Sequence, residues 1–242
     1  MAEETGLQLL SEDWERALAV VAHPDDLEYG ASSAIARWTS QGKRVSYLLI
    51  TRGEAGIDSM CPEQAGPRRE TEQRNSAAVV GVDTVEFLDY RDGTIEYGTS
   101  LRRDIARVIR KHRPEVLVST NHQLLFGGGA LNMADHRWVG IAVLDAARDA
   151  GNRWIFNDLL DEGLEPWDGV KMVLFDGSPS PTHAIDVTDH IDKRVASLDE
   201  HRGYIENLGQ SFDPYMYLRM NANVTGELFG CDYATSFEVI KI

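Results

Sequence analysis

A short apolar run that ends abruptly in polar residues constrains this chain more than any other segment. Residues 18–22 read LAVVA, with no alternation of apolar and polar positions, and residues 23–26 read HPDD. A run of this kind is typical of a parallel strand that is covered on both faces, so the chain leaves the sheet near His23. Pro24 fixes φ at a helix-compatible value and lacks the amide proton that a first helical turn leaves unpaired. We therefore predict a helix that begins at this proline.

The spacing within this turn predicts a metal site. His23 and Asp26, three residues apart, would lie on one side of the turn, and Asp25 would project at a different angle. An imidazole and a carboxylate are ligand types that suit zinc. We therefore expect His23 and Asp26 to bind a metal ion and Asp25 to act as a base. The alternative is that both carboxylates merely stabilise a helix N-terminus.

Further apolar runs alternate with helical segments along most of the chain. Strands are expected at 44–50, 84–88, 115–119, 171–175 and 183–187, and helices at 31–41, 68–80, 101–112 and 138–148. Successive strand–helix–strand crossovers imply a parallel sheet with helices on its faces. The hydrophobic content of 43% suffices for one large core. We predict a single domain over residues 1–242, a Rossmann-like three-layer α/β sandwich with a mostly parallel sheet.

The charge of the chain argues against two classes of partner. Its formal net charge is −15, whereas nucleic acids and anionic membrane surfaces attract patches of Lys and Arg. No stretch approaches the roughly 18 apolar residues of a membrane span, and the first residues lack the pattern of an export signal. Two isolated cysteines, Cys61 and Cys231, suit a reducing compartment. We therefore expect a cytoplasmic protein that binds neither nucleic acid nor membrane.

A catalytic zinc site needs a third protein ligand from a distant segment. His136, in the segment MADHRWVG, is the best placed of the remaining histidines, and His122, which closely follows a predicted strand, is its rival. Asp135 is expected either to start a helix or to orient a ligand through a hydrogen bond. Two histidines and one carboxylate also describe the iron site of non-haem oxygenases, so the ligand types leave both zinc and Fe²⁺ open.

Several motifs, in order along the chain, resemble those of one family. They are AHPDD at 22–26 followed by Glu28, TRGEAG at 51–56, RETE at 69–72, the FL and DG pairs between 87 and 93, and DH at 135–136. These segments resemble the signatures of the PIG-L/LmbE-like family of zinc-dependent N-acetylglucosaminide deacetylases and related amidases. Several short motifs that occur in the same order as in a family are much stronger evidence of relationship than a single short motif. The resemblance implies an LmbE-like α/β fold, and residues 205–230 are its least familiar part.

The resemblance also implies a reaction and the residues that perform it. His23, Asp26 and His136 would bind one zinc ion, and Asp25 would be the general base. The reaction would be hydrolysis of an N-acyl amide, chiefly an N-acetyl group, on an amino sugar or glycosylated small molecule. It would release acetate and a free amine.

Two further matches concern the substrate. Arg69 and Asp92 correspond to positions that hold the substrate sugar in relatives, so a small acetylated amino sugar or glycoside is the expected partner. The stretch from Asn207 onward, rich in aromatic residues and methionines, is expected to form either a lid or a contact between copies of the chain in a homo-oligomer.

One residue departs from the family pattern. Family members commonly carry HPDH, in which the first histidine helps to stabilise the oxyanion, but residues 133–136 of this chain read MADH. The thioether of Met133 cannot donate a hydrogen bond, and loss of such a donor costs about 10²–10³ in rate. We expect His122 to supply the missing donor. The alternative is a catalytically weak protein that retains the metal and binds a small molecule.

Overall fold

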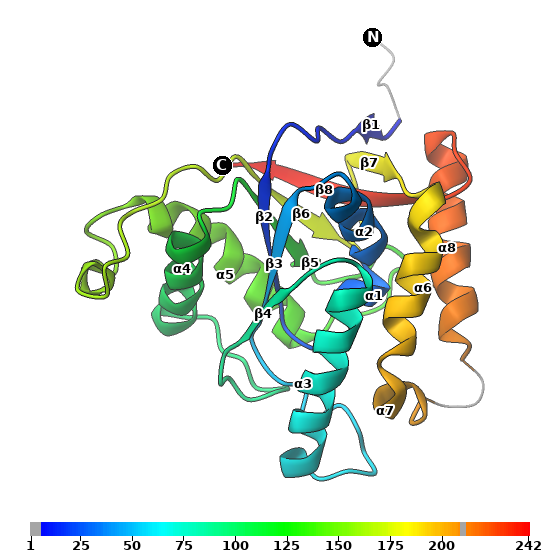
Figure 1. The fold of residues 1–242 in the computed structure, drawn as a ribbon, viewed down its shortest axis with the longest axis horizontal. Helices are drawn as coiled ribbons and strands as arrows, with labels where there is room; N and C mark the ends of the chain where they lie inside the picture. The colour runs from blue at the N-terminus through cyan, green and yellow to red at the C-terminus, as the bar shows by residue number, and fades with distance from the viewer. Residues whose placement is uncertain (1–5, 209–211) are drawn as a thin grey trace.

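The structure, a computed structural model, describes residues 6–208 and 212–242 (Figure 1). The strands are β1 (Gln8–Leu9), β2 (Arg16–Val21), β3 (Arg44–Leu49), β4 (Thr84–Phe87), β5 (Val116–Thr120), β6 (Met172–Asp176), β7 (His183–Asp186) and β8 (Ala234–Lys241). Within the described residues they form one sheet in the order β1-β7-β8-β6-β5-β2-β3-β4. β8 pairs antiparallel with β6 and β7, and the other neighbours pair parallel. This mostly parallel sheet confirms the predicted fold class.

Helices cover both faces of the sheet, which makes three layers (Figure 1). They are α1 (Asp26–Tyr29), α2 (Ser32–Ser40), α3 (Pro62–Val79), α4 (Thr99–His112), α5 (Ala134–Gly151), α6 (Ile191–Asp199), α7 (Arg202–Ile205) and α8 (Pro214–Phe229), with short 3-10 helices at Asn157–Leu160 and Thr188–His190. α4 and α5 pack together on one face, whereas α2, α3, α6 and α8 lie on the other.

The two buried faces explain the apolar run in β2. Ala17, Ala19 and Val21 belong to the core on the side of α2 and α3, and Leu18 and Val20 belong to the core on the side of α4 and α5. All five side chains are buried. A strand that is covered on both faces needs an apolar side chain at every position. The interpretation of this run as a buried parallel strand is confirmed.

The strand order changes direction at β2. β3 and β4 follow on one side of it, whereas β5 and β6 follow on the other. Such a switch point leaves a crevice at the carboxyl ends of the strands, where α/β proteins bind ligands. His23 lies just beyond the end of β2, and Asn121 directly follows β5. The fold therefore brings these two polar segments to the same crevice.

The structure corrects the predicted helix start at Pro24. α1 begins at Asp26, because Asp25 adopts the left-handed backbone conformation with φ of 85°. α3 and α5 begin several residues before their predicted starts, and β8 and α8 are not among the predicted elements.

Residues 209–211, within the stretch for which a lid or a subunit contact is predicted, lie outside the described residues. Both alternatives stay predictions.

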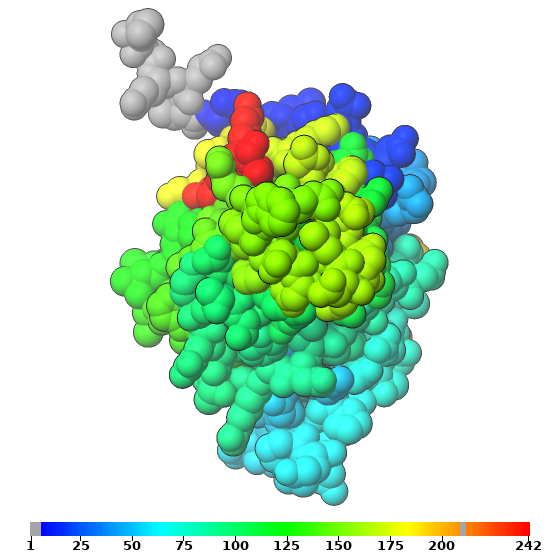
Figure 2. All heavy atoms as spheres, turned by 90° about the vertical axis from the view of Figure 1, so that its left-hand side faces the viewer, coloured from blue at the N-terminus to red at the C-terminus, as the bar shows by residue number. Residues whose placement is uncertain are grey.

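Figure 2 shows the face that α4 and α5 cover. Their green atoms, together with the yellow-green atoms of residues 152–170, cover most of this side of the molecule, and the red atoms at the end of the chain are visible above them. Among the described helices, none combines the length and the apolar character that crossing a membrane requires. The expected cytoplasmic location stays a prediction.

Candidate metal centre

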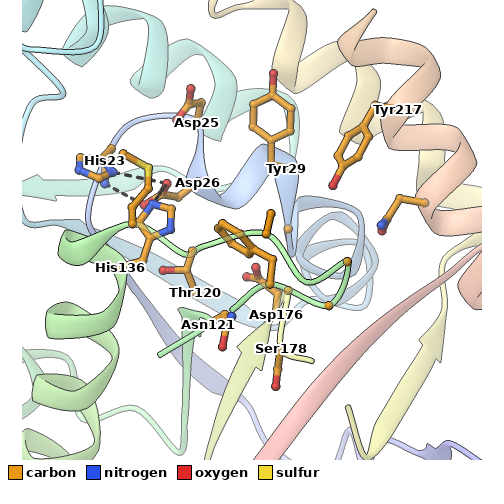
Figure 3. Close-up of a pocket in the computed structure, with 18 of the residues that line it drawn as sticks. His23, Asp25, Asp26, Tyr29, Thr120, Asn121, His136, Asp176, Ser178 and Tyr217 are labelled. Carbon is orange, nitrogen blue, oxygen red and sulfur yellow. Dashed lines mark hydrogen bonds and ion pairs between the residues drawn. The ribbon is translucent and has the colours of Figure 1, made fainter. Parts of the chain in front are cut away.

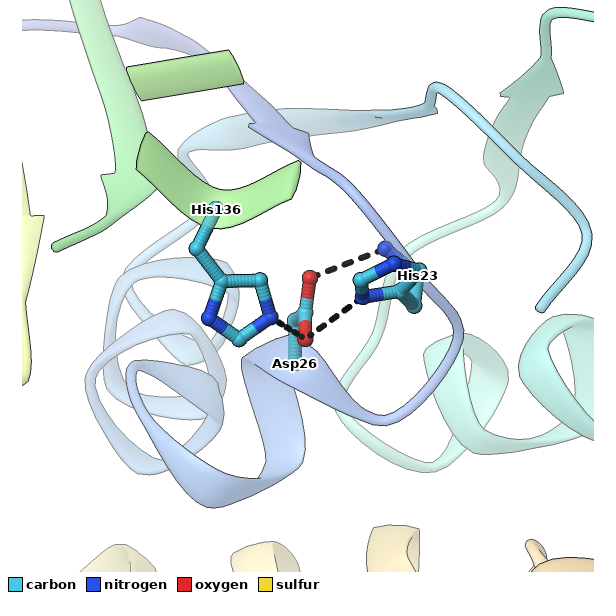
Figure 4. Close-up of side chains that lie close together, drawn as sticks. All are labelled: His23, Asp26 and His136. Atoms are coloured by element: carbon cyan, nitrogen blue, oxygen red, sulfur yellow. Dashed lines mark hydrogen bonds and ion pairs between the residues drawn. The ribbon is translucent and has the colours of Figure 1, made fainter. Parts of the chain in front are cut away.

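Three side chains from two distant segments meet at the crevice (Figure 4). His23 follows β2, Asp26 opens α1 and His136 lies in the first turn of α5. Nε2 of His136 is 3.0 Å from Oδ1 of Asp26, and Nδ1 of His23 is 3.6 Å from the same oxygen. One ligand atom from each residue lies within 4.8 Å of the others, and all three residues are buried. The structure thus brings together the three residues predicted to bind a metal.

The hydrogen bonds of Asn132 determine which nitrogen of His136 is free. The side-chain nitrogen of Asn132 donates to the carbonyl oxygens of Asn121 and Gln123, at 2.6 and 2.9 Å. Its oxygen therefore faces Nδ1 of His136 at 3.1 Å and accepts a hydrogen bond from it. The lone pair of Nε2 then points towards Asp26. Nε2 is buried and makes no hydrogen bond within the described part of the chain, as expected for a ligand that shares a cation with the carboxylate.

A second pair of carboxylates orients His23. Nε2 of His23 is 3.1 Å from Oδ1 of Asp92 and 3.2 Å from Oδ2 of Asp135. Both neighbours are acceptors, so this nitrogen carries the proton and Nδ1 is left to face Asp26. Metal-binding histidines commonly donate their second N–H to a carboxylate in this way. The role of Asp135 in orienting a ligand stays a prediction, and its contact is with the candidate ligand His23 rather than with its neighbour His136.

His23, Asp92 and Asp135 are themselves close enough to hold an ion. However, the two carboxylates already accept hydrogen bonds from backbone N–H groups at 2.8–3.2 Å, those of Ala55, Gly93 and Ile95. Asp135 also lies outside the pocket wall, whereas His23, Asp26 and His136 all line the pocket. The geometry therefore favours these three as the candidate metal ligands.

The charges of this cluster depend on one another. Burial favours the neutral form of His23, but the carboxylates of Asp26, Asp135 and Asp92 raise its pKa well above the usual value. Burial likewise opposes ionisation of Asp26, yet His136 and His23 hold its pKa far below the usual value. A buried carboxylate that stays ionised between two imidazoles is a suitable anchor for a cation.

Replacing Asp135 with asparagine is expected to lower zinc affinity about 10–100-fold, because the uncharged amide holds the His23 ring less firmly. Titration against a fluorescent zinc chelator measures this change. Asp161→Asn, at an exposed position without a side-chain hydrogen bond among the described residues, is the matched control. Equal affinities in the two variants would show that Asp135 does not orient a ligand.

Asp25 stands beside the cluster and is held by α3. Its backbone N–H donates to the side-chain oxygen of Gln73 at 3.0 Å, and its Oδ2 is 3.2 Å from Nη2 of Arg69. Burial raises the pKa of Asp25 to about 6, against the opposing charge of Arg69. A carboxyl group with a pKa in this range is suited to accept a proton near neutral pH.

Arg69 is predicted to bind the substrate sugar, and most of its contacts are within the protein. It lines the pocket, but its guanidinium donates to the carbonyl oxygens of Gly53 and Pro24 at 2.8 and 2.6 Å, in addition to its contact with Asp25. A side chain added at Gly53 or Gly56 would come within 2.3 Å of this group. Arg69 therefore links the turn at Asp25 to the loop that contains Gly53 through these contacts.

A buried polar network behind Asp25 was not anticipated from the sequence. The side-chain nitrogen of Gln73 donates to Oε1 of Glu28 at 3.1 Å, and the hydroxyl of Ser76 donates to the same oxygen at 2.5 Å. Nε2 of His201 lies 3.5 Å from Oε2 of Glu28, and both residues are inaccessible to solvent. The signal in the sequence is the polar pair Gln73 and Ser76, three residues apart on one side of α3.

The structure places His122, the predicted hydrogen-bond donor, outside the pocket wall, so its catalytic role stays a prediction. Its ring packs on Phe175, with ring centroids 4.5 Å apart, and a side chain added at Gly140 of α5 would meet its Cβ at 2.6 Å. His122 is not among the residues that line the pocket, because its side chain turns towards α5 after β5 has ended. Met133 does line the pocket and is 54% exposed.

The pocket extends well beyond the metal cluster (Figure 3). Its volume is about 840 Å³, within the range of small-molecule sites. Hydroxyl, amide, carboxyl and aromatic groups form the wall away from the cluster, among them Tyr29, Asn121, Phe126, Asp176, Ser178 and Tyr217. This composition suits a polar ligand with both hydroxyl groups and apolar ring faces.

Comparisons with known proteins agree on one family. A sequence profile described as GlcNAc-PI de-N-acetylase (PIG-L) matches residues 18–147. A diacetylchitobiose deacetylase of Thermococcus kodakarensis is 28% identical over 231 residues, which are 94% of this chain and 84% of that protein. A probable N-acetyl-alpha-D-glucosaminyl L-malate deacetylase 2 of Bacillus anthracis is 29% identical over 136 residues, 53% of this chain and 58% of that protein.

A solved structure has the same fold. The N,N'-diacetylchitobiose deacetylase from Pyrococcus horikoshii superposes with a TM-score of 0.86 at 24% sequence identity. The superposition covers 94% of this chain and 84% of that one. The overall fold described above is therefore shared with a solved protein.

Proposed function

Because the chain belongs to the GlcNAc-PI de-N-acetylase family, we propose that it hydrolyses the N-acetyl amide of an amino sugar or of a glycosylated small molecule. The products would be acetate and a free amine. The observation that carries this proposal is the cluster of His23, Asp26 and His136 in the wall of a large pocket, with the carboxyl group of Asp25 beside it.

We propose zinc as the ion that His23, Asp26 and His136 hold. Two imidazoles and one carboxylate are a common ligand set of catalytic zinc, and Fe²⁺ is the alternative with the same ligands. A zinc ion bound there would lower the pKa of a coordinated water molecule and polarise the amide carbonyl. Elemental analysis of protein purified without added metal would distinguish the two ions.

The residues near the candidate metal ligands would have different roles in the reaction. Asp25 would take a proton from the attacking water on a carboxylate oxygen and return it to the departing amine nitrogen. Arg69 would hold that carboxylate in place through the 3.2 Å contact. Asp92 would orient the His23 ring. The predicted contacts of Arg69 and Asp92 with the sugar stay predictions, and both residues line the pocket.

The direct test is release of acetate by purified protein. We expect N-acetylglucosamine and N,N'-diacetylchitobiose to yield acetate in the presence of zinc. Dialysis against a chelator should abolish the release, because the three ligands alone cannot activate water, and added zinc should restore it. A protein that holds one metal ion per chain and releases acetate from none of the acetylated amino sugars tested would support the alternative, a binding protein with little hydrolytic activity.

A further inference from the structure

The hydroxyl group of Thr120, the last residue of β5, is a polar group in the pocket wall that the proposed chemistry does not use. Thr120 lines the pocket and is 5% exposed. Its Oγ1 is buried and makes no hydrogen bond within residues 6–208 and 212–242. A buried polar group without a partner is costly, so a ligand that completes its hydrogen bond is favoured.

The alternation of side chains along β5 directs this hydroxyl to the pocket side of the sheet. Val116 and Val118 belong to the core on the side of α2 and α3. Ser119 points the other way, and its hydroxyl donates to the carbonyl oxygen of Val20 at 2.7 Å. Because successive side chains of a strand point to opposite faces, Thr120 shares the face of the two valines. α6 and α8 cover this same face, and both helices supply residues of the pocket wall.

Backbone contacts place the end of β5 beside the candidate metal ligand His136. The side chain of Asn132 donates to the carbonyl oxygen of Asn121 at 2.6 Å and faces Nδ1 of His136 at 3.1 Å. A side chain added at Gly140, which follows His136 by one helical turn, would meet the carbonyl oxygen of Thr120 at 3.2 Å. The unpartnered hydroxyl thus belongs to the strand end that packs against the first turns of α5.

Hydrolysis of an amide creates negative charge on the carbonyl oxygen. The water oxygen bonds to the carbonyl carbon, its proton goes to Asp25, and one electron pair of the C=O bond moves onto the carbonyl oxygen. When the C–N bond breaks, this pair re-forms the C=O bond and the proton goes to the departing nitrogen. A donor aimed at the oxygen stabilises the transition state and belongs away from the base, beside which the water lies. In Figure 3, Thr120 lies next to His136 and Asp25 lies on the opposite side of the cluster.

Other groups near the candidate ligands are less suited to this task. The thioether of Met133 cannot donate, and the described pocket wall does not include His122. Nδ2 of Asn121 donates to the carbonyl oxygen of Leu125 at 2.7 Å. The guanidinium of Arg69 donates to two backbone carbonyl oxygens at 2.8 and 2.6 Å. These donors are engaged within the protein, whereas the hydroxyl at the end of β5 is not.

Two tyrosine hydroxyls also belong to the pocket wall. Tyr204 lies on the side of the base, because its ring centroid is 5.1 Å from the guanidinium carbon of Arg69, which contacts Asp25. The hydroxyl of Tyr29 points away from the cluster in Figure 3. Neither position suits an oxygen that develops its charge away from the base.

We propose that the hydroxyl of Thr120 donates a hydrogen bond to the carbonyl oxygen of the acetamide group as negative charge develops there. Thr120 thereby replaces the donor that Met133 does not supply. This inference rests on the proposed function and assigns one further catalytic residue to the same site.

The first test is Thr120→Val, which keeps nearly the same shape and removes the hydroxyl. We expect kcat for N,N'-diacetylchitobiose to fall about 10–100-fold, as for loss of a hydrogen bond to a charged group. KM should change less than about twofold, because the bond forms only in the transition state. Thr120→Ser keeps the hydroxyl and should recover most of the rate. Thr84→Val, at an exposed position of β4, is the matched control.

A second measurement does not depend on turnover. In a methylphosphonamide analogue of N-acetylglucosamine the phosphorus is tetrahedral, like the carbonyl carbon after water has attacked it. Calorimetric titration should show that Thr120→Val binds this analogue more weakly than the wild type, by about the same factor as the loss in kcat. Metal content by elemental analysis should equal that of the wild type in every variant, and circular dichroism checks the fold.

Several results would overturn the proposal. They are a kcat of Thr120→Val within about twofold of the wild type, a rise in KM at unchanged kcat, and loss of the metal, which would indicate a structural role. A loss of kcat in Tyr204→Phe or His122→Phe but not in Thr120→Val would assign the donor to another residue. If wild-type protein releases no acetate, the proposed function fails instead. The titration then tests Thr120 alone, and equal affinities, or no binding of the analogue to either protein, would contradict its role.

Discussion

Replacing Asp25 with asparagine is expected to lower the rate of acetate release by about 10²–10⁴-fold while the protein keeps its metal. The amide of asparagine cannot accept the proton that the carboxylate would take from water. Its shape allows it to keep the contact with Arg69. Asparagine also tolerates the left-handed conformation that Asp25 adopts, with φ of 85°, better than most residues do. The turn that carries Asp26 is therefore expected to stay intact.

Two measurements are needed for this variant, kcat with an acetylated amino sugar and metal content by elemental analysis. Asp161→Asn, the same change at an exposed position, should leave both unchanged. A variant of Asp25 that loses its metal to the same extent as a ligand variant would contradict the division of roles. Asp25 would then be a ligand or a support for one, and another group would have to serve as the base.

Replacing His136 with alanine is expected to remove the metal and, with it, all measurable acetate release. The imidazole supplies one of three protein ligands, and its Nε2 has no other partner within the described residues. Loss of a direct ligand should exceed the 10–100-fold loss of affinity that is typical for residues behind the ligands. We therefore expect about one ion per chain in the wild type and almost none in the variant after dialysis.

His183→Ala is the control for this change, because His183 lies in β7 and does not line the pocket. Elemental analysis and acetate release should both match the wild type. Retention of a full equivalent of metal by His136→Ala would point to the neighbouring group of His23, Asp92 and Asp135. In that case Asp92→Asn, rather than His136→Ala, should remove the ion.

The parts of the fold that depend on local pattern could be predicted from the sequence. The apolar run in β2 is recognisable because both faces of that strand are buried. The start of α1 could not be predicted, because it depends on the positive φ of Asp25. That conformation is stabilised by partners on α3, Gln73 and Arg69, which follow more than 40 positions later. β8 was missed because it enters the sheet antiparallel, between strands that precede it in the chain.

The candidate site likewise has a part that could be predicted from the sequence and a part that could not. The proximity of His23 and Asp26 follows from their spacing, whereas their approach to His136 depends on how α5 packs against β2 and β5. His122 shows the limit of this reasoning. Its position after a strand follows from the sequence, but the direction of its side chain depends on the space that Gly140 leaves on α5. Asp176 gave no signal, because an aspartate before a glycine is equally typical of an exposed turn.

The match to the family profile ends at residue 147, and residues on both sides of this boundary line the pocket. All three candidate metal ligands and Asp25 precede it, whereas Asp176, Tyr217 and Thr235 follow it. Substitutions after residue 147 can therefore change part of the pocket wall while all three candidate metal ligands stay the same. The shape of the pocket and the candidate metal site are therefore encoded in partly separate segments of the chain.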